Sequence, residues 1–176
     1  MEPVPDVTSM AKSLQELEEL DWGEPTYNSA VDGRAYSLRR LPLERLSIDD
    51  IRFLVSHEIG LKWVLPLALE RLLVEPLCEA SYYAGDLLKS VIRLDRVHFT
   101  PSGDEISKLR EALGPIQPSE LKRLECPADV VETIALFLED GLTATFERPP
   151  TSRETYERWV THMRWHAKHK LPRRPG

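Results

Sequence analysis

Histidine and cysteine are the residue types in this 176-residue sequence that could bind a metal ion or act as nucleophiles. His57 is followed by Glu58, as in the zinc-protease signature, but that signature needs a second histidine where this chain has Leu61. Three further histidines near the C-terminus have the spacing of one helix face, but lysines and arginines, which disfavour a bound cation, surround them. These are His162, His166 and His169. The sequence therefore predicts no metal site.

The two cysteines, Cys78 and Cys126, do not form a CxxC pair. The first residues carry acids and prolines in place of a basic start and an apolar stretch, so we expect no secretory signal. Reduced, buried thiols are then expected in place of a disulfide. An enzyme built on Cys78 or His57 stays open as an alternative, but no glycine-rich phosphate loop or complete catalytic motif supports it. We expect a protein that is not an enzyme and needs no cofactor.

Charge is distributed unevenly along the chain, whose formal net charge is −6. Residues 151–176 hold seven Lys and Arg against two acids, whereas residues 1–150 hold 16 bases and 27 acids. An acidic body repels the phosphates of nucleic acids and attracts basic partners, so we expect no direct nucleic-acid binding. Trp159 and Trp165 nevertheless stand among the cations of the tail, where they could stack on bases. A nucleic-acid-associated adaptor or regulator that uses this tail is the alternative function that these residues leave open.

Hydrophobic residues make up 41% of the sequence, which is enough to build a core and excludes disorder caused by low hydrophobicity. No apolar run reaches the ~20 residues that a membrane span requires. The longest candidate, residues 61–74, is interrupted by Lys62, Glu70 and Arg71. We therefore expect a soluble cytoplasmic protein with no membrane partner.

Apolar residues recur at helical spacing along most of the chain, between serines that favour helix starts and glycines or prolines that favour helix ends. Ser13 and Ser47 are each followed three residues later by an acid, which is the spacing of a capping box. Ser102 has the same spacing, and Asp86 is predicted to cap another short helix. Pro66 lies inside the most apolar helix and predicts a kink or a fresh start there.

A further helix is predicted over residues 27–41, with an Asp-Gly pair at 32–33 that interrupts its start. Residues 142–146 form the one alternating, β-prone stretch, and a single strand is not stable alone. The predicted fold is an all-α, irregular single-domain bundle of six to eight helices with at most this minor β element. We predict a helical domain over residues 1–146, followed by a proline-linked basic helix or tail over residues 147–176.

Six distinctive segments follow one another along the first half of the chain. They are residues 13–27 (SLQELEELDWGEPTY), 39–43 (RRLPL), 48–52 (IDDIR), 59–70 (IGLKWVLPLALE), 82–88 (YYAGDLL) and 91–95 (VIRLD). In this order and spacing they resemble a bacterial family of immunity proteins from contact-dependent growth inhibition (CDI) systems. The resemblance covers residues 13–95 and continues more weakly to about residue 140, whereas the region from Phe146 does not match.

The resemblance implies a cytoplasmic protein that binds the C-terminal toxin domain delivered by a neighbouring cell and neutralises it without catalysis. Many such toxins are nucleases with basic substrate clefts, which an acidic inhibitor would complement. We predict that the acidic N-terminal face contacts the toxin and that a second acidic pair is the next candidate, although each of these acids could equally be a solvated surface group. The candidates are Glu16, Glu18, Glu19, Asp21 and Glu24 on the N-terminal face, and then Asp49 and Asp50.

Several residues of the matching segments fit a structural role as well as an interface. Gly60 and Gly85 suit helix ends, and Trp63 and Leu67 suit the core. Trp22 and Asp86 fit either role. The sequence does not decide which of these residues a partner contacts.

Overall fold

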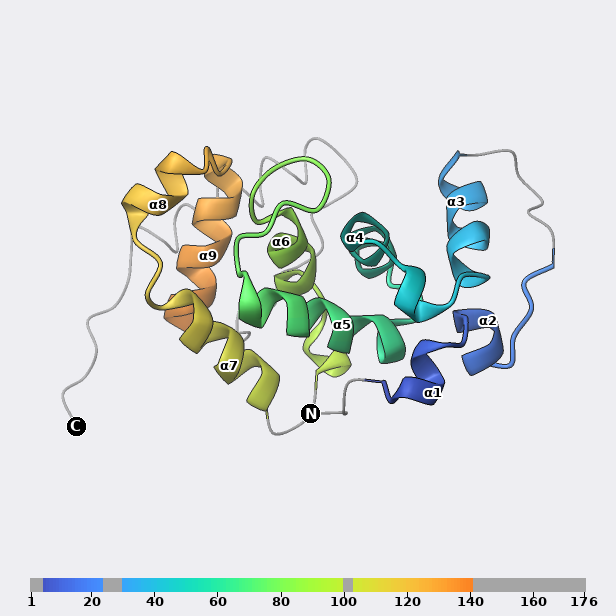
Figure 1. Ribbon diagram of the computed structural model, residues 1–176. Helices are drawn as coiled ribbons and strands as arrows, with labels where there is room; N and C mark the ends of the chain where they lie inside the picture. Colours follow the sequence, from blue (N-terminus) through green and yellow to red (C-terminus); the bar gives the residue numbers. More distant parts are fainter. Residues whose placement is uncertain (1–4, 24–29, 100–102, 141–176) are drawn as a thin grey trace, which may run out of the picture. The chain divides into compact units, whose positions relative to one another are not determined.

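The computed structural model describes residues 5–23, 30–99 and 103–140 of the chain (Figure 1). All of these residues belong to one compact unit, Met1–Ala144. The β-prone stretch at 142–146, the predicted boundary after residue 146 and the basic tail with its three histidines lie outside the described residues. The division of the chain at residue 146 therefore stays a prediction.

The described part of the chain folds into nine α-helices and two 3-10 helices, and it contains no strand. The α-helices are α1 (Val7–Met10), α2 (Leu14–Leu17), α3 (Ala30–Arg39), α4 (Ile48–Ser56), α5 (Leu61–Val74), α6 (Asp86–Ile92), α7 (Asp104–Leu113), α8 (Pro118–Arg123) and α9 (Ala128–Asp140). The 3-10 helices are η1 (Leu43–Arg45) and η2 (Arg96–His98). The all-α prediction is confirmed. The nine α-helices of the described residues exceed the predicted six to eight, and α1, a single turn of four residues, was not among those predicted.

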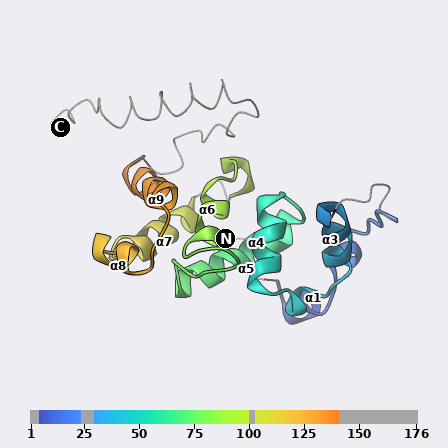
Figure 2. The same ribbon diagram turned by 90° about the horizontal axis from the view of Figure 1, so that it is seen from above.

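The core of the described unit is built on α5 and α6 (Figure 2). Helix α5 packs against α4, α6 and α7, and α6 also contacts α4 and α9. Val64 of α5 and Leu87 and Leu88 of α6 have no exposed surface. α5 is apolar on most sides because neighbours cover it on most sides, as its sequence predicts. None of the described helices is long and apolar enough to cross a membrane.

Two of the predicted helix starts are confirmed as complete capping boxes. The Ser13 hydroxyl accepts a hydrogen bond from the backbone N–H of Glu16, and the Glu16 carboxylate accepts one from the N–H of Ser13. Ser47 and Asp50 make the same reciprocal pair at the start of α4. These bonds satisfy N–H groups that the first helical turn would otherwise leave without partners.

Three details of the helix prediction are wrong. Helix α7 begins after Gly103, so Ser102 is not its N-cap residue. Helix α3 runs through Gly33 without a break, although a helical glycine costs roughly 0.5–1 kcal/mol, and Ala35, Leu38 and Arg39 of this helix are buried. Helix α5 does not restart at Pro66, because buried side chains on either side hold the helix in place, and the kink that was the other expectation stays a prediction.

Glutamates occupy the left-handed position that follows three helices, where glycine is the usual residue. Glu19, Glu58 and Glu125 follow α2, α4 and α8 with φ of 52°, 56° and 50°. In each case the next N–H donates to a carbonyl oxygen of the last helical turn: Leu20 to Gln15, Ile59 to Leu54 and Cys126 to Leu121. Helix α2 therefore ends at Leu17, with Glu19 in the left-handed position after it.

Candidate functional site

The predicted N-terminal acids differ in how far the fold itself uses them. Glu16 belongs to the capping box of α2, where its carboxylate accepts from the Ser13 N–H at 2.8 Å and the Ser13 hydroxyl at 2.7 Å. These two hydrogen bonds lower the pKa of Glu16. Glu18 forms an ion pair with Arg39, whose side chain is almost completely buried. Both acids thus fix the short segment that carries the other candidates.

Arg39 holds the segment after α2 against α3. Its Nη2 donates to the carbonyl oxygen of Leu20 at 3.0 Å, and its guanidinium lies 4.1 Å from the ring centre of Trp22. The Trp22 ring meets Tyr36 of α3 edge to face, at 5.4 Å between the ring centres. This packing determines where the exposed acids Glu19 and Asp21 stand.

Glu19 and Asp21 are the N-terminal candidates that the fold leaves most available to a partner. Both are exposed, and Asp21 accepts a hydrogen bond from the N–H of Gly23 at 2.8 Å, which shapes the turn that follows it. Glu24 lies outside the described residues. All four described acids of the N-terminal face are exposed, but Glu16 and Glu18 also bind Ser13 and Arg39.

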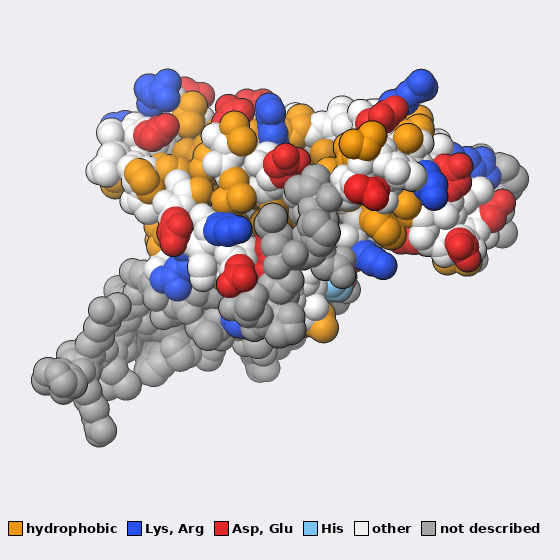
Figure 3. Space-filling model, turned by 60° about the horizontal axis from the view of Figure 1, so that its bottom comes forward, with side chains coloured by type: hydrophobic (Ala, Val, Ile, Leu, Met, Phe, Trp, Pro, Cys, Tyr) orange, Lys and Arg blue, Asp and Glu red, His pale blue; other side chains and the backbone are white. Residues whose placement is uncertain are grey.

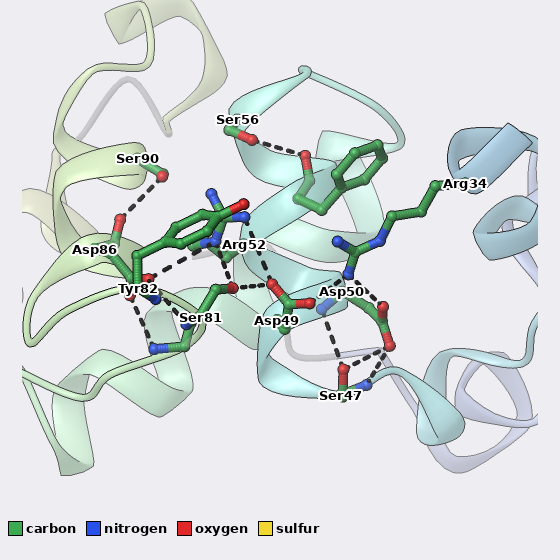
Figure 4. Close-up of polar contacts among 12 residues, drawn as sticks. Arg34, Ser47, Asp49, Asp50, Arg52, Ser56, Ser81, Tyr82, Asp86 and Ser90 are labelled. Atoms are coloured by element: carbon green, nitrogen blue, oxygen red, sulfur yellow. Dashed lines mark hydrogen bonds and ion pairs between the residues drawn. The ribbon is translucent and has the colours of Figure 1, made fainter. Parts of the chain in front are cut away.

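The second pair of candidates, Asp49 and Asp50, binds Arg34 of α3 (Figure 4). The Arg34 Nη2 lies 2.6 Å from Oδ2 of Asp49 and 2.8 Å from Oδ1 of Asp50, and its guanidinium covers the ring of Phe53. Burial raises the pKa of Asp50, but hydrogen bonds from Ser47 and Arg34 outweigh that effect and lower it overall. Asp49 and Asp50 thus join α3 to the first turn of α4.

The Asp49 carboxylate also reaches the segment between α5 and α6. Ser81 donates its hydroxyl proton to Asp49, and Arg52 donates from Nε to the same hydroxyl oxygen at 2.9 Å. The Arg52 guanidinium lies 3.5 Å from Asp49 and 3.8 Å from Asp86. A chain of charged and hydroxyl groups therefore links α3, α4 and α6.

Asp86 does not cap α6 as the sequence predicted, because Gly85 is the N-cap residue and makes no side-chain bond. The Asp86 side chain is instead buried and accepts three backbone hydrogen bonds from the preceding segment. The donors are the N–H groups of Ala80 at 2.9 Å, Ser81 at 2.9 Å and Tyr82 at 3.0 Å. The carboxylate thus organises a loop and leaves the helix start to glycine.

The structure does not gather the six candidates that it describes, which exclude Glu24, into one cluster. The N-terminal acids follow a single short segment, whereas Asp49 and Asp50 are bound into the contacts between helices. Sequence analysis missed the residues that organise both sets, Arg34, Arg39 and Arg52, and the exposed Tyr82. Arg39, Arg52 and Tyr82 all lie in the segments that resemble the immunity family, and that was the one sequence signal that could have pointed to them.

Neither cysteine has the lowered pKa that a nucleophilic thiol needs. Burial, with a contribution from Glu75, raises the pKa of Cys78 to about 11, so its thiol is protonated at neutral pH. Burial also raises the pKa of Cys126. The ring of His57 stacks on Phe53 and its Nδ1 lies 2.8 Å from the Phe53 carbonyl oxygen. Within the described residues, no group of three or more His, Cys, Asp or Glu could hold a metal ion.

Asp50 makes the stability of the fold depend on pH. Its folded pKa lies below the ordinary value of 3.8, so it stabilises the folded state above that pH and loses this effect as the pH falls through the folded pKa. We expect Asp50→Asn to lower the free energy of unfolding by about 1 kcal/mol at pH 7. In urea titrations this difference should shrink below pH 4, whereas exposed Glu111→Gln should show no such trend. A difference that stays constant down to pH 2.5 would contradict the assignment.

The described unit is all-helical, its polar side chains bind one another across helices, and both of its thiols have raised pKa values. The family model for CDI immunity proteins matches residues 16–109, more than half of the chain. The chain therefore belongs to the CDI immunity proteins, a family whose members are in general not enzymes and bind a cognate toxin. No curated protein matches the chain.

Proposed function

We propose that this chain binds and neutralises the cognate CDI toxin domain in the cytoplasm of the bacterium that produces it. The family match over residues 16–109 carries the proposal, since it spans the elements from α2 into α7. The protein acts by binding alone and is not an enzyme. The raised pKa of the buried Cys78 thiol supports this, because a nucleophilic cysteine needs a lowered one.

The charge of the chain supports a toxin with a basic surface, such as a nuclease. Residues 1–150 hold 27 acids and 16 bases, and a nuclease must attract the phosphates of its substrate. Acidic and basic side chains are interspersed on the face shown in Figure 3. Complementary charges of this kind increase the rate of association and the specificity more than the affinity itself.

The exposed acids Glu19 and Asp21 are the residues of the N-terminal face that we propose to meet the basic surface of the toxin. Glu16 and Glu18 support them by fixing the segment through Ser13 and Arg39. Glu24 belongs to the same proposed face, and Asp49 and Asp50 remain the second candidates because Asp49 is still partly exposed.

Calorimetry with the toxin domain encoded next to this gene tests the function, with the toxin's nuclease activity assayed in parallel. Tight binding with loss of activity is the expected result. Tight binding with activity intact would reject blockage of the active site. No binding would overturn the immunity function and would make RNA or DNA binding by the tail the next experiment.

Charge reversal at Glu19 and Asp21 tests the proposed face. We expect Glu19→Lys/Asp21→Lys to slow association with the toxin by about tenfold at low salt, because rim charges act mainly on the association rate. Surface plasmon resonance at several salt concentrations measures this rate. The matched control, Glu70→Lys/Glu111→Lys, changes the net charge equally at exposed positions of α5 and α7. Equal slowing in both variants would remove the N-terminal face from the proposal.

A further inference from the structure

Tyr82 exposes 71% of its surface in the segment between α5 and α6 (Figure 4). Its ring gains little from burial on folding, yet it lies in one of the segments that resemble the immunity family. Tyrosine, tryptophan and arginine are the residue types that most often dominate the binding energy of protein interfaces. An exposed tyrosine is therefore notable when the chain around it is fixed.

The backbone that carries Tyr82 is held in one conformation by groups buried below it. The Asp86 carboxylate accepts the three consecutive N–H groups of residues 80–82, and an antiparallel bridge between Glu79 and Ala84 closes the base of the loop. Asp86 is almost completely buried, so water does not compete strongly for these bonds. We call residues 79–85 the tyrosine loop.

The ring itself is also oriented before any partner arrives. The Arg52 guanidinium lies 4.7 Å from the ring centre of Tyr82, and Arg52 is in turn held by Ser81, Asp49 and Asp86. The Arg52 side chain is 12% exposed, so one face of the ring covers it while most of the tyrosine faces solvent. A side chain fixed in this way loses little conformational entropy when it binds.

We propose that the tyrosine loop is the anchor through which this protein holds the toxin domain. The proposal rests on the proposed function and adds a contact that the charge of the chain does not reveal. The Tyr82 ring enters an apolar crevice of the toxin, and cationic groups at the rim of that crevice meet the exposed Glu79 and the partly exposed Asp49. Arg52 and the buried Asp86 act as positioning residues for this contact.

Anchoring and charge steering make different kinetic predictions, which separates this proposal from the N-terminal face. Removal of a rim charge changes mainly the association rate, whereas removal of a buried anchor changes mainly the dissociation rate. Tyr82→Ala is therefore expected to raise the dissociation rate of the toxin complex by about 30-fold or more, the effect of a typical interface hot spot. The association rate should change less than threefold.

Surface plasmon resonance with the full chain and the isolated toxin domain provides the test. Tyr82→Phe keeps the ring and should bind within about threefold of the native protein, and Val97→Ala removes a similarly exposed apolar side chain from η2 as the matched control. Thermal unfolding of each variant confirms that the proteins compared are folded. If Tyr82→Ala unfolds, the dissociation rates of Tyr82→Leu and Tyr82→Phe are compared in its place. Faster dissociation of Tyr82→Leu than of Tyr82→Phe then supports the anchor, and equal rates overturn it.

Each outcome decides the proposal. Fast dissociation of Tyr82→Ala with a native-like Val97→Ala supports the anchor. A native dissociation rate for Tyr82→Ala overturns the anchor and leaves the immunity function intact, provided that the native protein binds. A native protein that does not bind the toxin overturns both.

Discussion

Replacement of Asp86 by alanine is expected to lower the free energy of unfolding by about 3–5 kcal/mol, the usual cost of removing one partner from a buried charged network. The change removes the acceptor for the N–H groups of residues 80–82 and leaves Arg52 without a buried counter-charge. Urea unfolding followed by circular dichroism measures the loss. Asp86→Asn keeps a carbonyl oxygen as an acceptor, so its free energy of unfolding should decrease less than that of Asp86→Ala.

Asp95 offers a matched control for this experiment. It also accepts a backbone hydrogen bond, from Val97 at 3.1 Å, but it is exposed at the start of η2. Asp95→Ala should therefore cost about 1 kcal/mol or less. Similar losses for the two alanine variants would show that burial of the Asp86 carboxylate contributes little to the fold.

Some parts of the fold that depend on local sequence were predicted correctly, although Ser102 and Asp86 were not the caps that the sequence predicted. Ser13 and Ser47 were identified as helix starts because a capping box needs only residues three positions apart. The bounds of α5 were predicted because Gly60 precedes a run that is apolar on most sides. Glu19 and its counterparts after α4 and α8 were missed, because a left-handed glutamate has no signature of its own in a sequence.

The candidate site depends on pairs that are distant in sequence, which helical periodicity does not specify. Arg34 is 15 residues from Asp49, Glu18 is 21 residues from Arg39, and Ser81 is 32 residues from Asp49. The spacing of apolar residues indicates which face of a helix is buried, but it does not indicate which arginine meets which acid. The acids were therefore identified as a class, while the structure was required to show which of the described ones bind a partner within the fold.

Asp86 shows how one local pattern can have two structural causes. An acid at the start of an apolar helix is commonly an N-cap, and its position beside Gly85 agrees with that interpretation. The side chain instead turns back to the loop before it, because the loop offers three N–H groups and α6 can begin at a left-handed glycine. The same residue thereby supports both the core and the proposed anchor.

Substitution of Gly60 by alanine is expected to lower the free energy of unfolding by about 2–4 kcal/mol, for two reasons that add. Gly60 has φ of +62°, a conformation that residues with a Cβ atom rarely adopt, and it is the N-cap residue of α5. A Cβ atom there would lie 2.6 Å from Cδ2 of Leu14, which is completely buried in α2. Gly60 thus allows α2 to pack against the start of the central helix.

A double-mutant cycle separates the steric part of this effect from the backbone part. Leu14→Ala alone removes a buried side chain and should cost about 2–5 kcal/mol. In the double variant Gly60→Ala/Leu14→Ala the clash is absent. The decrease in its free energy of unfolding, measured by urea unfolding, should therefore be smaller than the sum of the two single decreases by about 1–2 kcal/mol. Gly33→Ala is the control, because Gly33 lies within α3 with open space around it. This substitution should raise the free energy of unfolding by about 0.5–1 kcal/mol. Additive losses in the cycle would show that Gly60 is required for its backbone conformation alone and not for the approach of Leu14.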